Sequence, residues 1–392
     1  MENLYALRAQ KATNSELTEL FRMSGQPDVI SFAGGLPDPA WFQEEIDDVA
    51  SEILKNHRKT ALQYGPVPGI TFVREFIAER MTKQNMSSKT ENILITSGAL
   101  QGLDLVCKVF VDPGDLVLVE APTYLGAIST IESYEAEVDS IACDEDGLKV
   151  DELEEFLKNT SQKPKFIYVI PTFQNPSGRV MSLERRKKLI DTANKYEIPI
   201  VEDHAYGELR FSGQDIPTLK GLDTEGRVIF LGTFSKILSP GIRLGWIAAS
   251  EFLINKLILF KQGTDQMSSS LSQLIAYEAG KRGLIDKQIE VSKKNLRQKR
   301  DVLIKALEKY FGNSAKWVTS EGGFFTWVEI DKDIDTLQLL YKACDEYKVA
   351  YVAGPSFFVD RSGKNSLRIS YSLPNIDIIE EGVKRLYQVF NQ

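Results

Sequence analysis

The segment TFSKILSPGIRLGW, at positions 233–246, places several chemistry-bearing side chains close together. Lys236 follows the hydroxyls of Thr233 and Ser235, and Arg243 comes seven residues after it. Hydroxyls and a guanidinium suit a phosphate group, and a lysine is costly to bury unless something uses or pairs its charge. The segment therefore predicts a phosphate-bearing cofactor that is held covalently through the amine of Lys236.

A second group of residues closes a β-branched run further upstream. In VEDHAYGEL, Asp203 ends the run and Tyr206 follows three residues later. Ligands of open α/β sheets bind just past the carboxyl ends of the strands. A lone aspartate there would more often cap a helix or a turn. Together with Lys236, however, Asp203 and Tyr206 place an acid, a phenol and an amine at the same edge of the predicted sheet. This combination suits pyridoxal phosphate, whose ring nitrogen takes an acidic partner.

Weaker signals come from other segments that follow or form predicted strands. ITSGALQGLDLV, at 95–106, reads as a strand, a small-residue turn and a helix whose free N–H groups could bind phosphate, although it could be an ordinary connection. PTFQNPSG offers Asn175 to the cofactor, but Asn-Pro is also common turn chemistry. Tyr124 could stack on a flat ring or fill the core. Arg368 could anchor a substrate carboxylate or face solvent.

These residues depend on strands and helices that alternate between about 90 and 250. Strands are predicted at 92–96, 116–120, 136–142, 165–170, 198–203, 227–232 and 243–249, and helices fill several gaps, as at 150–159 and 182–196. Such alternation predicts a mostly parallel sheet covered by helices. Beyond it, helices near 287–310 and 334–347 and strands such as GGFFTWVEI predict a smaller α+β domain.

Three regions follow from this pattern. We expect an N-terminal segment at 1–45 that packs with the small domain, a large cofactor-binding domain at 46–285 and a small C-terminal α+β domain at 286–392. The first forty residues show no sheet pattern.

Composition narrows the possible partners. The 392 residues carry 47 basic and 55 acidic side chains, for a net charge of −8, which argues against nucleic acid because phosphate backbones need a basic footprint. Three cysteines without a CxxC pair predict reduced thiols in a cytoplasmic protein, and two histidines exclude a His-rich metal site. No apolar run approaches the length of a membrane span, and we expect no signal peptide.

Taken together, TFSK, GIRLGW, QNPSG, EDHAYGEL, LQYGPVPGI and SFAGGLPDP resemble the pyridoxal-phosphate-dependent aminotransferases of fold type I, class I/II. The nearest subgroup is that of the 2-aminoadipate and kynurenine aminotransferases, and the resemblance extends from about 28 to 372. It implies a large domain with a mostly parallel seven-stranded sheet and a smaller α+β domain. It also implies pyridoxal 5'-phosphate, a small-molecule amino acid and 2-oxo acid as substrates, and a homodimer with shared active sites.

The resemblance implies a ping-pong reaction in which an L-amino acid gives its amino group to a 2-oxo acid, expected to be 2-oxoglutarate. Lys236 would form the Schiff base with the cofactor and act as the general base. Asp203 would pair with the ring nitrogen, Tyr206 and Asn175 would bond the phenolic oxygen, and Tyr124 would stack on the ring.

The resemblance assigns the remaining positions to the phosphate and the substrate. The phosphate would be held by Gly98, Ala99, Leu100, Thr233, Ser235, Arg243 and Tyr64, the last from the neighbouring subunit. Arg368 and Asn175 would take the α-carboxylate of the substrate, close to the backbone of Gly34 and Gly35.

Two departures and two rival functions stay open. Ala99 and Leu100 stand where relatives often carry a hydroxyl or an amide, so the phosphate would rely on backbone there. Thr18 stands where some aminoadipate-specific relatives have an arginine for the distal acid group, which weakens the case for aminoadipate as the main substrate, and Arg22 lies nearby.

The rival functions are a β-lyase or other carbanion chemistry on the same scaffold, and a cofactor-sensing regulator domain. Aromatic, branched-chain, glutamate-like and aminoadipate donors all remain possible.

Overall fold

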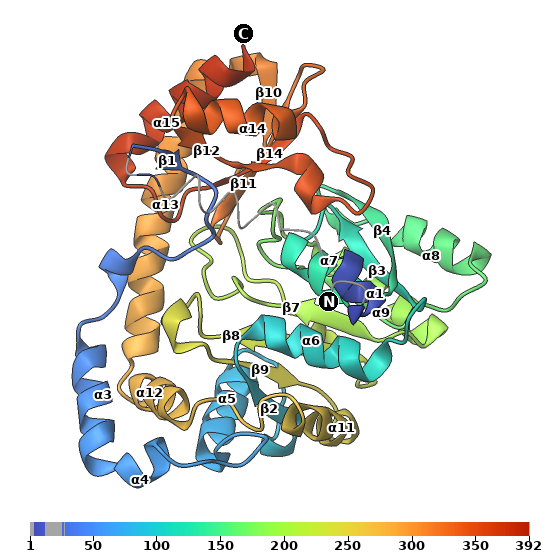
Figure 1. The fold of residues 1–392 in the computed structure, drawn as a ribbon, viewed down its shortest axis with the longest axis vertical. Helices are drawn as coiled ribbons and strands as arrows, with labels where there is room; N and C mark the ends of the chain where they lie inside the picture. Colours follow the sequence, from blue (N-terminus) through green and yellow to red (C-terminus); the bar gives the residue numbers. More distant parts are fainter. Residues whose placement is uncertain (1–3, 12–25, 27, 392) are drawn as a thin grey trace.

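The computed structural model describes residues 4–11, 26 and 28–391, and within them an eight-stranded, a four-stranded and a two-stranded β-sheet (Figure 1). The larger sheet has eight strands in the order β2-β9-β8-β7-β6-β3-β4-β5. Their bounds are β2 Ile93–Thr96, β3 Leu116–Ala121, β4 Glu137–Asp144, β5 Gly147–Leu148, β6 Ile167–Val169, β7 Ile200–Asp203, β8 Val228–Thr233 and β9 Gly245–Ala248.

Strand direction in the larger sheet sends most carboxyl ends to one edge. The pairs β8/β7, β7/β6, β6/β3 and β3/β4 are parallel. Strand β9 is antiparallel to both β8 and β2, so β2 runs in the same direction as β8. The loops that leave β2, β3, β6, β7 and β8 therefore meet at the same edge, where open α/β sheets bind their ligands.

The seven predicted strands are all present, and the mostly parallel α/β sheet is confirmed. The predicted number of strands is wrong by one, because β5 adds an antiparallel edge through pairs of Cys143 with Leu148 and of Asp144 with Gly147. A strand of two residues has too few side chains to show an alternating pattern.

Helices cover both faces of the larger sheet. Buried side chains of α6 (Ala99–Phe110), α7 (Leu125–Glu132) and α11 (Glu251–Gln262) share one apolar cluster with the strands. Those of α8 (Val150–Asn159), α9 (Leu183–Tyr196) and α10 (Leu219–Leu222) share another. Helix α9 begins at Leu183 because the Ser182 hydroxyl caps it by accepting the Arg185 N–H at 3.3 Å.

A second, antiparallel sheet lies in the C-terminal part of the chain (Figure 1). Its order is β10-β11-β14-β13, with bounds β10 Ala315–Trp317, β11 Phe325–Ile330, β13 Val352–Ala353 and β14 Ser366–Ser370. Helices α14 (Thr336–Asp345) and α15 (Ile376–Phe390) accompany it. The long helix α13 (Leu284–Tyr310) runs from the region of the larger sheet to this one.

The remaining elements are helices and short 3₁₀ turns. They are α1 Leu7–Lys11, η2 Pro39–Trp41, α3 Glu45–Asn56, α4 Arg58–Ala61, α5 Thr71–Lys83, η3 Thr90–Asn92, η4 Pro240–Ile242, α12 Ser270–Lys281, η5 Gly312–Ser314 and η6 Gly354–Phe357. Buried side chains of α5, α12 and α13 belong to one large apolar cluster that also includes residues of the smaller sheet.

The expectation of no sheet pattern in the first forty residues is wrong. Strand β1 (Ile30–Ser31) pairs in parallel with β12 (Val349–Ala350). The Ile30 N–H donates to the Lys348 carbonyl at 2.9 Å, and the fully buried Phe32 donates to Ala350 at 2.8 Å. With two residues, β1 too is below the length at which alternation is visible. The division at 45 and 285 stays a prediction, and Thr18 and Arg22 lie outside the described residues.

Within the described ranges, no helix is long and apolar enough to cross a membrane. The same part of the chain contains no group of three or more histidine, cysteine or acidic side chains that could hold a metal ion. Cys107 and Cys344 are buried, Cys143 is partly buried, and all three are free thiols.

Candidate active site

A cavity of about 280 Å³ lies at the carboxyl edge of the larger sheet. Gly35, from the segment after β1, and Arg368, from β14, also line it, so the cavity lies between the two sheets. Of the predicted site residues, all but Tyr64 and Gly34 line it, namely Gly35, Gly98, Ala99, Leu100, Tyr124, Asn175, Asp203, Tyr206, Thr233, Ser235, Lys236, Arg243 and Arg368. Tyr64 is 79% exposed and lies elsewhere, and its contact with a neighbouring subunit stays a prediction.

The Lys236 amine lies inside this cavity without a charged partner. Its Nζ donates to the Gly35 carbonyl at 2.8 Å, and no carboxylate of the described residues lies within ion-pair distance. Burial, together with the smaller effect of the Arg368 charge, lowers the pKa of Lys236 to about 8, against the opposing charge of Asp203. The buried lysines Lys261 and Lys299 are instead paired with Asp265 at 2.8 Å and with Asp38 at 2.9 Å. Lys236 is therefore the buried amine that is free to react.

Asp203 ends β7, as predicted, and its carboxylate is held by two donors. Oδ1 accepts the Ala205 N–H at 3.2 Å, and Oδ2 accepts the Tyr168 hydroxyl at 2.7 Å. Burial raises the pKa of Asp203, while these hydrogen bonds and the nearby Lys236 oppose the rise. The Ala205 contact is the turn bond that the alternative expects, and the same carboxylate also lines the cavity, where it can face a protonated ring nitrogen.

Sequence reasoning missed Tyr168. It lies within the apolar run KFIYVI, which predicts only a strand. Its position opposite Val201 depends on β6 being the neighbour of β7. A single sequence does not give the strand order, and a hydroxyl in an otherwise apolar strand was the one signal available.

One end of the cavity has the donors that a phosphate group needs. Helix α6 begins after Gly98, which provides no side-chain cap, so the N–H groups of its first turn lack intrahelical partners. Arg243 lies against this turn, where its Nη2 donates to the Ser97 carbonyl at 3.0 Å. A Cβ at Gly98 would lie 2.6 Å from Nη2. The hydroxyls of Thr233 and Ser235 line the same cavity, so this end fits a phosphate.

Arg368 and Asn175 form a pair in the lining of the cavity. Arg368 is 4% exposed, which rules out the solvent-facing alternative. Its Nη1 donates to Asn175 Oδ1 at 2.9 Å and its Nη2 donates to the Ala33 carbonyl, while Nε has no partner among the described atoms. The guanidinium lies 4.2 Å from the ring centroid of Phe325. A buried guanidinium with an unused N–H fits a substrate carboxylate.

Aromatic side chains complete the walls. Tyr206 is buried, and its ring contacts Phe324 and Phe325 edge-on, with ring centroids 5.3 Å apart in each pair. Burial raises the pKa of Tyr206, so its phenol keeps its proton and can donate a hydrogen bond. Tyr124, which precedes α7, is partly buried and lines the cavity. Its position allows stacking on a flat ring, which stays a prediction.

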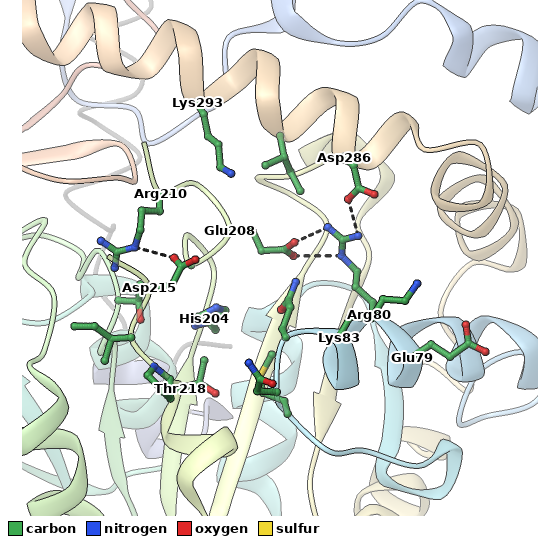
Figure 2. A pocket seen from close by; sticks show the side chains of 18 of the residues that line it. Glu79, Arg80, Lys83, His204, Glu208, Arg210, Asp215, Thr218, Asp286 and Lys293 are labelled. Carbon is green, nitrogen blue, oxygen red and sulfur yellow. Dashed lines mark hydrogen bonds and ion pairs between the residues drawn. The ribbon is translucent and has the colours of Figure 1, made fainter. Parts of the chain in front are cut away.

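A larger cleft of about 700 Å³ opens between α5, the segment after β7 and α13 (Figure 2). Its charged groups largely satisfy one another. Arg80 donates to Glu208 at 2.5 Å and to Asp286 at 2.9 Å, and Arg210 pairs with another lining carboxylate, Asp215, at 3.1 Å (Figure 2). His204 lines this cleft, and burial lowers its pKa to about 3. We place the chemistry in the smaller cavity because the unpaired amine and guanidinium are there.

The chain belongs to the class I and II aminotransferases, whose family model matches residues 27–386. It is 42% identical to aromatic-amino-acid aminotransferase 1 of Thermococcus litoralis, over 100% of this chain and 95% of that protein. The kynurenine aminotransferase of Pyrococcus horikoshii, solved in complex with PMP, has a TM-score of 0.95 and 41% identity, covering 100% of this chain and 97% of that one. The α-aminoadipate aminotransferase of Thermus thermophilus, solved with N-(5'-phosphopyridoxyl)-L-leucine, has a TM-score of 0.92 and 36% identity. The match covers 99% of this chain and 97% of that one.

These comparisons confirm the predicted family and its fold. The chain is an aminotransferase of the pyridoxal-phosphate fold type I, and its relatives agree with the predicted aminoadipate and kynurenine subgroup. Family membership indicates pyridoxal phosphate as the cofactor, and the phosphate-binding end, the buried acid and the unpaired lysine of the cavity fit that group.

Proposed function

We propose that this aminotransferase moves the amino group of an L-amino acid to 2-oxoglutarate by a ping-pong mechanism, with pyridoxal phosphate attached at Lys236. The observation that carries the proposal is the unpaired Lys236 amine, which shares one cavity with the Asp203 carboxylate and the Arg368 guanidinium. A lysine, an acid and an arginine in this arrangement supply the attachment point, the partner of the ring nitrogen and the substrate anchor.

Each end of the cavity has a separate binding role in this proposal. When bound, pyridoxal phosphate supplies an electron sink that stabilises negative charge at the substrate Cα. The N–H groups at the start of α6, with Ser235 and Arg243, would hold the phosphate. Asp203 would hold the ring nitrogen in its protonated form. Arg368 would orient the substrate carboxylate through its free Nε, which fixes the Cα near Lys236.

Lys236 would also move the proton of the reaction. Its Nζ would take the proton from the substrate Cα and pass it on to the cofactor within the same half-reaction, and the second half would run these transfers in reverse. A general base works best when its pKa lies near the working pH. With a pKa of about 8, the Lys236 amine is protonated below that pH and neutral above it. Both forms are therefore accessible close to neutrality.

We propose that the donor has an apolar or aromatic side chain. Leu36, Leu125 and Phe325 line the cavity together with the anchor residues. The related enzymes named above act on aromatic amino acids and kynurenine, which supports this class, and the aminoadipate enzyme provides the contrast.

We propose a homodimer with shared sites. Tyr64 and Leu62 are 79% and 59% exposed, and Phe252 and Leu259, two turns apart on α11, are 82% and 61% exposed. The stretch around Tyr64 also contacts Met267, just beyond α11, through the Gly65 N–H. A second copy would cover these apolar side chains and bring its Tyr64 to the phosphate. Light scattering should give about twice the 44.1 kDa of one chain, and a monomer would contradict this proposal.

We also propose a cytoplasmic location, which is supported by the three unpaired thiols.

A half-reaction tests the proposed function. The protein loaded with pyridoxal phosphate is mixed with an amino donor in the absence of a 2-oxo acid, and absorbance and products are recorded. We expect the cofactor band to change and one 2-oxo acid to be released per subunit, without ammonia. Lys236→Ala should abolish both changes. Release of pyruvate and ammonia from a cysteine conjugate would favour a β-lyase, and full turnover by Lys236→Ala would refute the mechanism.

A further inference from the structure

Tyr168 holds a position that the family assignment leaves without a role. It lies in the middle of β6, is fully buried and lines the cavity. In the register of the sheet it stands opposite Val201, two residues before Asp203. Residues two apart in a strand point to the same face. The phenol of Tyr168 therefore extends along the carboxyl edge and reaches Asp203 Oδ2 at 2.7 Å.

Asp203 has few other donors. Apart from Tyr168, the Ala205 N–H reaches Oδ1 at 3.2 Å, and no second donor to Oδ2 occurs among the described residues. Besides Tyr168, the titratable groups that influence Asp203 or are influenced by it are Lys236, Glu120, Tyr124 and Tyr206. Lys236 favours the ionised form, and the Glu120 carboxyl, when charged, opposes it. Burial raises the pKa of Asp203, and the Tyr168 hydrogen bond works against that rise.

We propose that Tyr168 is a positioning residue, whose hydroxyl aims the Asp203 carboxylate into the cavity and keeps it ionised opposite the ring nitrogen of the cofactor. The inference rests on the proposed role of Asp203. Tyr168 acts through Asp203 and has no contact of its own with the reacting atoms. If Oδ2 lost its donor, the carboxylate would be free to rotate and would hold its proton more tightly.

Tyr168→Phe tests this inference, because it removes one hydroxyl and keeps the buried ring. Tyr351→Phe is the matched control, since Tyr351 is also fully buried, lies between β12 and β13 outside the cavity lining, and donates its hydroxyl to the Thr336 carbonyl at 2.6 Å. We expect Tyr168→Phe to weaken binding of pyridoxal phosphate to the apoprotein by about tenfold, the usual cost of a lost bond to a charged group. The control should leave the affinity unchanged.

Two further readouts do not depend on activity. Carbon-13 NMR of aspartate-labelled apoprotein, with the signal assigned through Asp203→Asn, should show a higher pKa for Asp203 in Tyr168→Phe than in the parent. In a double-mutant cycle, Tyr168→Phe should cost little affinity once Asp203 is already Asn, because the two residues act as one unit. An unchanged Asp203 titration, or an equal affinity loss in both backgrounds, would overturn the proposal.

A variant with the opposite effect keeps the proposal testable if Tyr168→Phe does not fold. 3-Fluorotyrosine at position 168 keeps the ring and makes its hydroxyl a stronger donor. It should lower the pKa of Asp203, and a rise or no change would refute the inference. Failure of the proposed function would instead appear as turnover by Lys236→Ala, which leaves the Tyr168 measurements on apoprotein unaffected.

Discussion

Gly98→Ala gives a quantitative test of the phosphate-binding end of the cavity. Gly98 has φ +103° and ψ 163°, a backbone region that is essentially confined to glycine. Alanine there should cost about 1–3 kcal/mol of folding free energy. The new Cβ would also lie 2.6 Å from Arg243 Nη2 and 3.3 Å from its Cζ, so the guanidinium must move.

The displaced guanidinium sets the expected effect on cofactor binding. A hydrogen bond to a charged group contributes about 1.5–3 kcal/mol. Loss of the Arg243 bond to phosphate should therefore raise the Kd of the apoprotein for pyridoxal phosphate by roughly ten- to a hundredfold. Fluorescence titration measures the Kd, and urea unfolding measures the stability.

Gly114→Ala separates backbone strain from the contact with Arg243. Gly114 also has a positive φ, +85°, but an added Cβ meets nothing within 4 Å, and the turn lies before β3 at the other end of that strand. This variant should lose stability and keep the parental Kd. The reasoning fails if Gly98→Ala binds pyridoxal phosphate as tightly as the parent, or if both variants lose the same affinity.

Three other perturbations have expected outcomes. The rate of amine labelling at Lys236 in apoprotein should rise with pH through about 8, because burial lowers the pKa of its amine and only the neutral form reacts; a rate that is flat to pH 10 would contradict this. Arg80→Met should cost about 2 kcal/mol in urea unfolding, since Glu208 loses its partner at 2.5 Å, whereas Lys309→Met on the surface should change little. Burial raises the pKa of Glu120 from 4.5 to about 7, so the folded state binds the extra proton in that range and its stability falls as pH rises from 4.5 to 7. Glu120→Gln should remove about 3 kcal/mol of that fall, and an unchanged slope would disprove the assignment.

The sequence pattern predicted the larger sheet well because its strands are long enough to show a period. Asp203 and Lys236 were correctly expected at one rim, since the carboxyl ends of parallel strands meet at one edge. Strands β1 and β5 were missed because two residues carry no alternation.

Contacts between distant segments were the part that sequence could not provide. Arg368 could have faced solvent or the cavity, because strand alternation does not say which face is buried. Its burial depends on Asn175, which lies 193 residues earlier, and on the Ala33 carbonyl. Tyr168 became visible as a partner of Asp203 only when β6 and β7 were placed side by side.

The central claim is that Lys236 carries the cofactor, and reduction followed by peptide mapping tests it most directly. Protein loaded with pyridoxal phosphate is treated with sodium borohydride and digested, and the phosphopyridoxyl mass is located by tandem mass spectrometry. We predict that it lies on Lys236 alone and is absent from Lys261, the buried lysine that is paired with Asp265. Modification of any other lysine in place of Lys236, or no modification, would contradict the account.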